Sequence, residues 1–366
     1  MKILTVIGAR PQFIKAALVS KKLRSYSQQE EILVHTGQHY DSNMSEQFFQ
    51  EMEIPKPDYN LGVGSGNHGW QTGKILMELE AVLLAEKPDW VLVYGDTNST
   101  LAGAIAAAKL HIPVAHVEAG LRSFNRKMPE EINRLLSDSV SDLLFAPTAT
   151  AVNNLIREGI PQDKIHLVGD VMYDASLFYS TIASQNSNIL NQLQLSPQKY
   201  LLATIHRAEN TNDPNRLRAI FTALGELDIP VILPLHPRTK VALEKEGLLQ
   251  QLRQTLTLIE PVGYLDMIQL EKNARLIITD SGGIQKEAFF HRVPCITLRE
   301  ETEWVELVEL GWNQILPPHQ ANMIKDKIQT VLDNFSLPDT VPSIYGDGKA
   351  VEKIVNLLLN SQQFIA

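Results

Sequence analysis

Short apolar, β-branched runs alternate with longer segments of helical periodicity from one end of the chain to the other. These runs predict strands at residues 3–7, 31–35, 90–94, 114–118, 143–146 and 165–168, and then at residues 200–205, 231–235, 255–259, 276–279 and 295–298. Amphipathic segments such as 71–86 and 99–109 predict helices between them. Because strands that alternate with helices form parallel βαβ units, the pattern predicts an α/β protein.

The two successive sets of strands predict two Rossmann-like, doubly wound domains, each with a parallel sheet. The length of 366 residues favours two domains as well. We place the boundary near Gly169 and Asp170, so that the domains comprise residues 1–170 and 171–346. The C-terminal segment 347–366, which is helical over 347–360, is expected to cross back onto the first domain.

Composition and charge exclude several classes of protein. A net charge of −9 argues against binding to nucleic acid or acidic membranes, which requires a basic surface. The chain has no apolar run long enough to span a bilayer, and its first residues lack the zones of a signal peptide. The single cysteine, Cys295, cannot form an intrachain disulfide or a cysteine-based zinc site. We therefore expect a cytoplasmic protein with no membrane and no nucleic-acid partner.

Polar, titratable and glycine residues recur where the predicted strands end. In open parallel sheets, ligands bind beyond the carboxyl ends of the strands. If the two sheets face each other, one cleft collects all of these groups, which are Gly8-Ala9-Arg10, Gly37-Gln38-His39, Gly95-Asp96, Glu118, His206-Arg207, His236, Asp280-Ser281-Gly282-Gly283 and Arg299.

The turn Thr279-Asp280-Ser281-Gly282-Gly283 follows an apolar strand and opens a helix. Free N–H groups and the helix dipole make such a start an anion site, and the glycines allow close approach of a diphosphate. A tight turn with Ser281 as N-cap gives the same pattern, so the turn alone leaves both interpretations open. Glu287, one turn later, is placed to accept from ribose hydroxyls. Arg10 and Lys15 put two cations near the opening of the first helix, which favours anion binding over a solvated helix start.

Asp96, Glu118 and Glu131 are carboxylates at one predicted sheet edge. Burial and like-charge proximity there would raise their pKa values, as acid–base catalysis requires. Asp96 and Glu131 also suit ordinary helix starts. His206 and His236 each end a strand of the second set, which favours a functional role for the pair. Since no His-x-x-x-His or comparable spacing appears, we predict no metal site.

The segment Gly64-Ser65-Gly66-Asn67-His68-Gly69 matches the dinucleotide fingerprint literally. That fingerprint has meaning only between a strand and a helix, and here it follows the proline-interrupted stretch 55–61. We interpret it as a flexible loop and predict no NAD site and no cofactor.

Six segments, in this order, resemble the non-hydrolysing UDP-N-acetylglucosamine 2-epimerase family over essentially the whole chain. They are Gly8-Ala9-Arg10-Pro11-Gln12-Phe13-Ile14-Lys15, Tyr94-Gly95-Asp96-Thr97-Asn98-Ser99-Thr100, His116-Val117-Glu118-Ala119-Gly120-Leu121-Arg122, Pro129-Glu130-Glu131-Ile132-Asn133-Arg134, His206-Arg207-Ala208-Glu209-Asn210 and Thr279-Asp280-Ser281-Gly282-Gly283-Ile284-Gln285-Lys286-Glu287. The resemblance implies a glycosyltransferase-B arrangement of the two domains, with a UDP-sugar between them, and a homodimer.

The resemblance also implies the chemistry and the residues. UDP is eliminated as the C2 proton leaves, giving a 2-acetamidoglycal, and its return with protonation of the other face inverts C2. Such isomerases supply precursors of surface polysaccharides. The catalytic residues implied are Asp96, Glu118, Glu131 and His206. The residues implied to hold the nucleotide and substrate are Arg10, Lys15, Arg134, His236, Tyr264, Ser281, Gly282, Gly283, Glu287 and Arg299.

Three details bear on which member of the family this chain resembles. Familiar members have arginine after the second-domain Thr-Glu pair, where this chain has Trp304. After Gln38-His39 the sequence continues as Tyr40-Asp41-Ser42-Asn43-Met44, which argues against the activation by a second UDP-sugar found in some members. The stretch 122–129 looks closer to the branch that acts on UDP-2,3-diacetamido-2,3-dideoxyglucuronate. One hypothesis is that Arg122, Arg126 or Lys127 meets the extra carboxylate; a basic surface loop is the alternative.

Three other functions fit the predicted fold. A glycosyltransferase would bind a UDP-sugar on the second domain, but it has no evident need for three carboxylates at strand ends of the first. A hydrolysing epimerase would release UDP and free sugar. A catalytically silent UDP-sugar sensor is disfavoured by the intact set of titratable groups.

Overall fold

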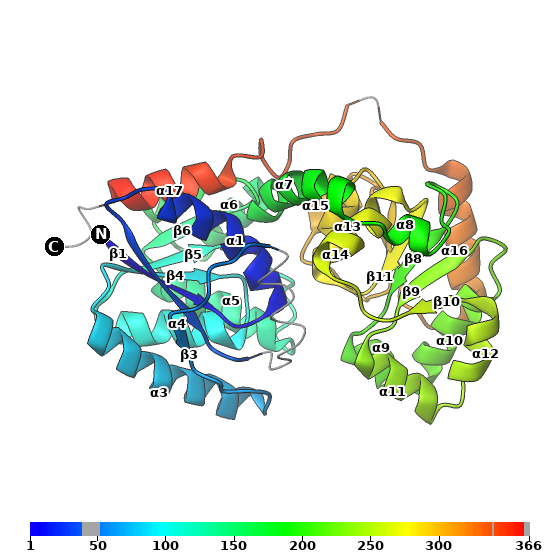
Figure 1. Cartoon of the computed structure of the whole chain (residues 1–366), viewed down its shortest axis with the longest axis horizontal. Coiled ribbons are helices and arrows are strands. Elements are labelled where there is room, and N and C mark those ends of the chain that lie inside the picture. Colours follow the sequence, from blue (N-terminus) through cyan, green and yellow to red (C-terminus); the bar gives the residue numbers. More distant parts are fainter. Residues whose placement is uncertain (39–51, 339, 362–366) are drawn as a thin grey trace. The chain divides into compact units, whose positions relative to one another are not determined.

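The computed structural model describes residues 1–38, 52–338 and 340–361. The chain forms two compact units (Figure 1), of which unit 1 comprises Met1–Phe178 and Pro342–Ala366, and unit 2 comprises Tyr179–Val341. The sequence-based boundary precedes Val171, whereas this division falls inside the helix α7, Val171–Asn186.

Unit 1 contains a seven-stranded parallel sheet in the order β3-β2-β1-β4-β5-β6-β7. Its described elements are β1 Lys2–Ile7, α1 Arg10–Arg24, β2 Glu30–His35, β3 Tyr59–Asn60, α3 His68–Glu86, β4 Trp90–Tyr94, α4 Asn98–Lys109, β5 Val114–Val117, α5 Pro129–Val140, β6 Leu143–Ala146, α6 Ala149–Arg157, the 3₁₀ turn Gln162–Lys164, β7 Ile165–Leu167, the first half of α7, and α17 Ala350–Asn360. Strand order reverses beside β1, and open sheets bind ligands at such a point.

Unit 2 repeats this plan with a six-stranded parallel sheet in the order β10-β9-β8-β11-β12-β13. Its described elements are α8 Ile189–Gln192, β8 Leu201–Thr204, α9 Ala208–Thr211, α10 Pro214–Gly225, β9 Val231–Pro234, α11 Pro237–Lys245, α12 Leu249–Thr255, β10 Thr257–Ile259, α13 Tyr264–Asn273, β11 Leu276–Thr279, α14 Gly282–Phe290, β12 Cys295–Thr297, α15 Val305–Glu309, β13 Asn313–Ile315 and α16 Ala321–Asn334. The order reverses beside β8, so β8 in unit 2 corresponds to β1 in unit 1.

The central strands are buried along their whole length, as strands covered by helices on both faces must be. Every residue of β4, β8 and β11 is buried. In unit 1, helices α3, α4 and α5 pack side by side, while α17 packs against α1 (Figure 1). Rigid, covered sheets of this kind fix the positions of the turns that follow their strands.

The predicted α/β class with two parallel sheets is confirmed, and every predicted strand range overlaps an observed strand. The predictions missed β3 and β13, two edge strands whose short runs carry little apolar signal. They were also wrong about the glycine-rich segment 64–69. A short strand does precede it, and its last residues begin helix α3 at His68, where Gln71 donates to the carbonyl of Gly64 at 2.7 Å.

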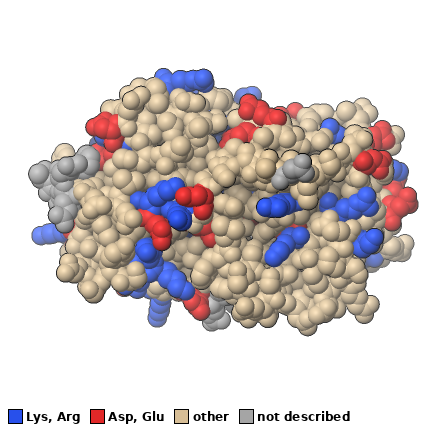
Figure 2. Space-filling model, turned by 90° about the horizontal axis from the view of Figure 1, so that it is seen from above, with Lys and Arg blue, Asp and Glu red and all other residues tan. Residues whose placement is uncertain are grey.

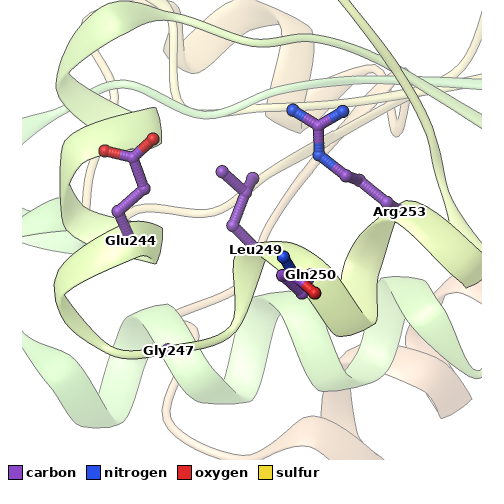
Figure 3. Close-up of a pocket in the computed structure, with 5 residues that line it drawn as sticks. All are labelled: Glu244, Gly247, Leu249, Gln250 and Arg253. Atoms are coloured by element: carbon purple, nitrogen blue, oxygen red, sulfur yellow. The ribbon is translucent and has the colours of Figure 1, made fainter.

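Charge is mixed over the face shown in Figure 2, where basic and acidic side chains are interspersed. Within the described residues, no helix is both long and apolar enough to cross a bilayer, and no group of His, Cys, Asp and Glu is arranged to hold a metal ion. A pocket of about 360 Å³ lies between α11 and α12 in unit 2 (Figure 3). Its lining residues include none of the strand-end groups and are Glu244, Gly247, Leu249, Gln250 and Arg253.

Candidate active site

The turn after β1 is drawn tightly against the ends of its neighbouring strands. A Cβ on Gly8 would lie only 2.1 Å from the Thr36 hydroxyl and 2.2 Å from that of Ser99, so only glycine fits there. The side chain of Gln12 accepts from the amide of Gly8 at 2.8 Å and donates to the carbonyl of Tyr94 at 2.9 Å. This one amide therefore fixes the end of β1 relative to the end of β4.

An ion pair joins the first helix to the end of β5. Lys15 Nζ lies 2.5 Å from Glu118 Oε1, and each side chain is only 9% exposed. Glu118 has a φ of 71°, a left-handed conformation that costs a non-glycine residue energy and is found preferentially at functional sites. Arg10 is the first residue of α1 and is half-buried. The structure thus brings Lys15 to the carboxylate of Glu118.

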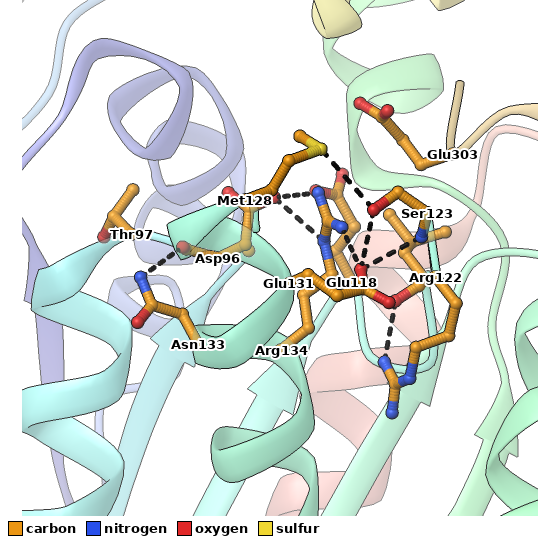
Figure 4. A network of polar contacts seen from close by, with 12 residues as sticks. Asp96, Thr97, Glu118, Arg122, Ser123, Met128, Glu131, Asn133, Arg134 and Glu303 are labelled. Atoms are coloured by element: carbon orange, nitrogen blue, oxygen red, sulfur yellow. Dashed lines mark hydrogen bonds and ion pairs between the residues drawn. The ribbon is translucent and has the colours of Figure 1, made fainter. Parts of the chain in front are cut away.

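A second charged cluster connects the end of β4 to helix α5 (Figure 4). Arg134 donates from Nε and Nη2 to Asp96 Oδ2, at 3.0 and 2.7 Å, and from Nη1 to Glu131 Oε2 at 2.6 Å. Arg134 and Glu131 are buried, whereas the Asp96 side chain is 30% exposed. One guanidinium therefore holds two of the three predicted carboxylates, and Asp96 is the more accessible of the two.

Both oxygens of the Glu131 carboxylate accept hydrogen bonds from groups of the protein. It accepts from the amides of Ser123 and Phe124 at 3.0 and 2.9 Å, and from the Ser123 hydroxyl at 3.1 Å. Burial alone would raise the pKa of Glu131, but these hydrogen bonds and the charge of Arg134 outweigh it and lower that pKa. The expected rise in pKa is therefore wrong for Glu131, because its partners favour the charged form.

The Arg122 side chain forms ion pairs with two carboxylates of the protein. Its Nη2 lies 2.8 Å from Asp138 Oδ2 and 2.6 Å from Glu158 Oε2, and its side chain is only 1% exposed. The hypothesis that Arg122 meets a substrate carboxylate is therefore wrong, since its buried guanidinium is already paired with two carboxylates of the protein. Arg126 and Lys127, in the same loop, are exposed.

In unit 2 a fully buried aspartate joins the turns after β8 and β11. Asp280 accepts from the amides of His206, at 3.0 and 3.1 Å, and of Arg207 at 2.9 Å. It also accepts from Asn210 Nδ2 at 3.0 Å, and His206 Nδ1 lies 3.5 Å from Asp280 Oδ1. The His206 and His236 rings lie 5.3 Å apart, with His236 capping helix α11. The two predicted histidines are therefore neighbours at the switch point of this sheet.

The N-terminus of helix α14 is open. Ser281 is the N-cap residue of this helix, as the alternative interpretation predicted, but its side chain makes no capping hydrogen bond with any described residue. A Cβ on Gly282 would lie 2.5 Å from Glu303 Oε1, and Glu303 in turn is paired with the buried Arg299 at 3.1 Å. The free amides at this helix start remain available to an anion.

A buried acidic side chain, Glu287, lies on helix α14 about one turn after its start. Glu287 is 6% exposed, and Tyr264, at the start of α13, is 4% exposed. Burial, and then the charge of Glu287, raises the pKa of the Tyr264 hydroxyl well above its usual value. Burial likewise raises the pKa of Glu271, while it lowers that of His291, 3.6 Å away, to about 4. Burial thus disfavours the charged forms of Tyr264, Glu271 and His291, which lie near Glu287.

The chain matches the family model described as UDP-N-acetylglucosamine 2-epimerase over residues 21–359. It is 54% identical to a UDP-N-acetylglucosamine 2-epimerase homolog of Methanococcus maripaludis, over 98% of this chain and 100% of that one. It is 53% identical to UDP-2,3-diacetamido-2,3-dideoxy-D-glucuronate 2-epimerase of Pseudomonas aeruginosa, over 98% and 99%. The Methanocaldococcus jannaschii UDP-GlcNAc 2-epimerase, solved in complex with UDP-GlcNAc and UDP, superimposes with a TM-score of 0.91 at 46% identity, covering 98% and 99%.

The chain belongs to the UDP-N-acetylglucosamine 2-epimerase family.

One departure from familiar epimerases has a clear structural setting. Trp304, which follows the Thr302-Glu303 pair, is buried, and the ammonium of Lys286 lies 4.0 Å from the centroid of its ring. A cation over an indole face is a favourable contact, and it is stronger when desolvated. In this epimerase the aromatic ring thus packs against α14 from the outside. The other departure, at residues 39–44, lies outside the described residues.

Sequence reasoning missed the buried polar residues that position the epimerase site. Gln12 joins two strand ends, and Asn133 donates to the carbonyl of Asp96 at 2.9 Å. Asn210 bridges Asp280 and the carbonyl of Leu298, both at 3.0 Å. The available signal was a buried amide or acid on the apolar face of a helix, which the helical period alone cannot distinguish from a surface position.

Proposed function

We propose that this chain interconverts two UDP-linked 2-acetamido sugars that differ only at C2, as an isomerase of the non-hydrolysing type. The observation that carries the proposal is the set of carboxylates paired with cations at the strand ends of unit 1, combined with a glycine-rich helix start in unit 2 that lacks a side-chain cap. Family membership over nearly the full chain supports the same assignment. Its relatives include a UDP-2,3-diacetamido-2,3-dideoxy-D-glucuronate 2-epimerase and UDP-N-acetylglucosamine 2-epimerases.

The proposed reaction has two steps and returns all atoms. A base takes the C2 proton while the C1–O bond to UDP breaks, which leaves a C1=C2 double bond in a 2-acetamidoglycal. UDP then adds back to C1 as a proton is delivered to the other face of C2. Because a C2 proton is weakly acidic, its removal depends on stabilising the departing diphosphate and on positioned acid–base groups.

In unit 1, Glu118 and Asp96 are proposed as the groups that exchange protons at C2, because each lies at a strand end and retains exposure. Lys15 and Arg134 hold these two carboxylates in place. Glu131 is proposed to fix Arg134 and the loop at Ser123, since all of its interactions favour a permanent negative charge. Glu131 would therefore act indirectly, by holding the Arg134 side chain that positions Asp96.

In unit 2, the amides at Gly282 and Gly283, with Ser281, are proposed to bind the diphosphate. The neighbouring histidines, His206 and His236, would support its departure, and Arg10 of unit 1 is proposed as a further cation for the nucleotide. Glu287 is proposed to accept from the ribose, with Tyr264 beneath it. Arg299 acts through Glu303, which it holds against Gly282.

We propose the diacetamidouronate as the physiological sugar, in view of the 53% identity to the Pseudomonas aeruginosa epimerase. Its additional carboxylate needs a cation. Arg126 and Lys127 are exposed on the loop that Glu131 anchors, and they are the candidates that remain once Arg122 is paired.

Incubating the enzyme in D₂O with each of the two UDP-sugars separates the proposal from its alternatives. We expect deuterium at C2 of intact UDP-sugar, with faster exchange for the uronate than for UDP-GlcNAc, as measured by NMR and mass spectrometry. Faster use of the neutral sugar would contradict the choice of substrate alone. Accumulation of free sugar would identify a hydrolysing enzyme, and absence of exchange with both sugars would contradict the epimerase assignment.

We also propose that the enzyme is a homodimer that uses helix α3. Trp70, Met77 and Leu84 are 54, 60 and 57% exposed, and their seven-residue spacing aligns them in one stripe along the helix. Charged side chains flank the stripe: Lys74, which is paired with Glu78, and the exposed Glu80. An apolar stripe of this length is self-complementary across a two-fold axis, which suits a second copy of the same chain.

Placing a charge in the α3 stripe should dissociate the dimer. For Met77→Glu combined with Leu84→Glu we expect the dimer dissociation constant to rise roughly 100-fold, since two charges per subunit lose their hydration at the interface without partners. Sedimentation velocity over a concentration series measures this constant. Leu167→Glu, at an apolar side chain 57% exposed on β7, is the matched control. An unchanged dimer in the α3 variant would show that the interface lies elsewhere.

The free thiol of Cys295 is buried, and burial raises its pKa to about 12. A chain with this single unreactive thiol suits a reducing compartment, and we propose that the enzyme acts in the cytoplasm.

A further inference from the structure

His116 occupies a central position in unit 1 that the proposed chemistry does not use directly. It lies on β5 and is fully buried. Its Nδ1 is 2.7 Å from Asp138 Oδ1, on helix α5, and its Nε2 is 2.7 Å from the carbonyl oxygen of Gly95, just after β4. Both contacts are short enough to be strong hydrogen bonds.

The chemistry of the two partners determines where the imidazole protons must be. A backbone carbonyl can only accept, so Nε2 must carry a proton for the contact with Gly95. An ionised carboxylate can only accept as well, so Nδ1 must carry a proton for the contact with Asp138. A neutral imidazole has one N–H and satisfies one of these bonds, whereas an imidazolium satisfies both.

Asp138 is held in its ionised form by its other neighbours. Its Oδ2 accepts from the amide of Gly120 at 3.1 Å and lies 2.8 Å from Arg122 Nη2. Both of these contacts are to donors, and they stabilise the carboxylate form of Asp138 independently of His116. A proton on Asp138 therefore does not supply the bond to His116 Nδ1.

These contacts join the three elements that carry the proposed catalytic carboxylates. Gly95 immediately precedes Asp96 at the end of β4, and His116 lies two positions before Glu118 on the strand path of β5. Asp138 shares one face of α5 with Arg134 and Glu131, since these residues are spaced by four and three. The imidazole is thus bonded to β4 and α5 from its place on β5.

We propose that His116 is a buried imidazolium that acts as a positioning residue, fixing the carboxylates of Asp96, Glu118 and Glu131 relative to one another. The positioning part rests on the proposed function. The charged groups around the ring balance: Asp138 and Glu158 offset His116 and Arg122, and Arg122 bridges the two acids. A buried charge is retained at such a place when it is fully paired and fully hydrogen-bonded.

The charge state can be read directly by NMR on the intact protein, with ¹⁵N-labelled histidine. We expect one histidine whose two ring nitrogens are both protonated near neutral pH, with two slowly exchanging N–H protons. Both signals should vanish in His116→Gln and remain in His111→Gln, a control at an exposed position. A non-protonated nitrogen assigned to His116 would overturn the inference. This measurement needs no substrate, so it holds whether or not the proposed reaction is found.

The positioning role is tested by kinetics. For His116→Gln and for Asp138→Asn we expect kcat for C2 exchange to fall roughly 100-fold, the effect of a misplacement on the order of 1 Å, while KM and UDP affinity stay within about twofold. Combining the two changes should cost little more than either alone, because both break one bridge. Thermal unfolding of each variant reports any loss of fold. A folded His116→Gln enzyme with unchanged kcat would overturn the positioning role, as would additive losses in the double variant.

Discussion

Glu118→Gln should lower the rate of hydrogen exchange at C2 by roughly 10²- to 10⁴-fold, the usual contribution of one acid–base group. The amide keeps the size of the carboxylate but cannot take a proton, and it loses the ion pair with Lys15 at 2.5 Å. UDP affinity should change little, because the turn that we propose to bind the diphosphate belongs to unit 2. Exchange is measured in D₂O by NMR, and UDP binding by calorimetry.

Glu86→Gln provides the matched control for Glu118→Gln. Glu86 is also a carboxylate paired with a lysine, at 3.1 Å from Lys2, but it lies at the amino end of the sheet, where β1 begins. We expect this variant to retain full exchange activity. Full activity in Glu118→Gln would remove Glu118 from the catalytic group, whereas equal losses in the two variants would indicate a general effect on unit 1.

Gly282→Ala should weaken UDP binding roughly 10- to 100-fold, in line with an overpacking cost of about 1–3 kcal/mol. The added methyl would lie 2.5 Å from Glu303 Oε1. Because Glu303 is buried and tied to Arg299, it cannot move aside without breaking that pair. The helix start would shift, and its amides would no longer converge on the diphosphate. Calorimetric titration with UDP gives the affinity directly.

Gly283→Ala is the informative comparison, since it adds the same methyl one residue later. There the nearest atom, Glu287 Oε2, lies 4.0 Å from the added Cβ, which is ordinary contact. We expect its UDP affinity to exceed that of Gly282→Ala by about tenfold. Equal affinities for the two variants would show that crowding at Gly282 does not control the site.

The sequence predicted the scaffold because the features that determine it are local. Buried parallel strands appear in the sequence as apolar runs, and the turns after them contain glycines and polar residues. The two sheets and the groups at their strand ends can therefore be predicted from the pattern. Edge strands such as β3 carry too few buried residues to be recognised. The start of α3 at His68 was missed for a related reason: its first turn is exposed and has no apolar period.

The distribution of partners within the site could not be predicted, because it depends on distant residues. The pKa of Glu131 is lowered by the amide of Ser123, eight residues upstream, and by Arg134. The guanidinium of Arg134 also binds Asp96. Arg122 has its charge taken by Asp138 and Glu158, and neither is marked as its partner in the sequence. Motifs identify which groups are present, whereas contacts decide which of them remain available to a substrate.

The chain passes from unit 1 to unit 2 after Phe178 and returns after Val341. Unit 2 is therefore an insertion within unit 1, whose last helix, α17, buries Val351, Ile354 and Leu358. During synthesis the whole of unit 2 leaves the ribosome before α17 does. The inserted unit can fold first, while the surface of α1 that packs against α17 stays uncovered until α17 has been made. All seven strands of the unit 1 sheet are thus made before unit 2, and the helix that covers α1 is made only after it.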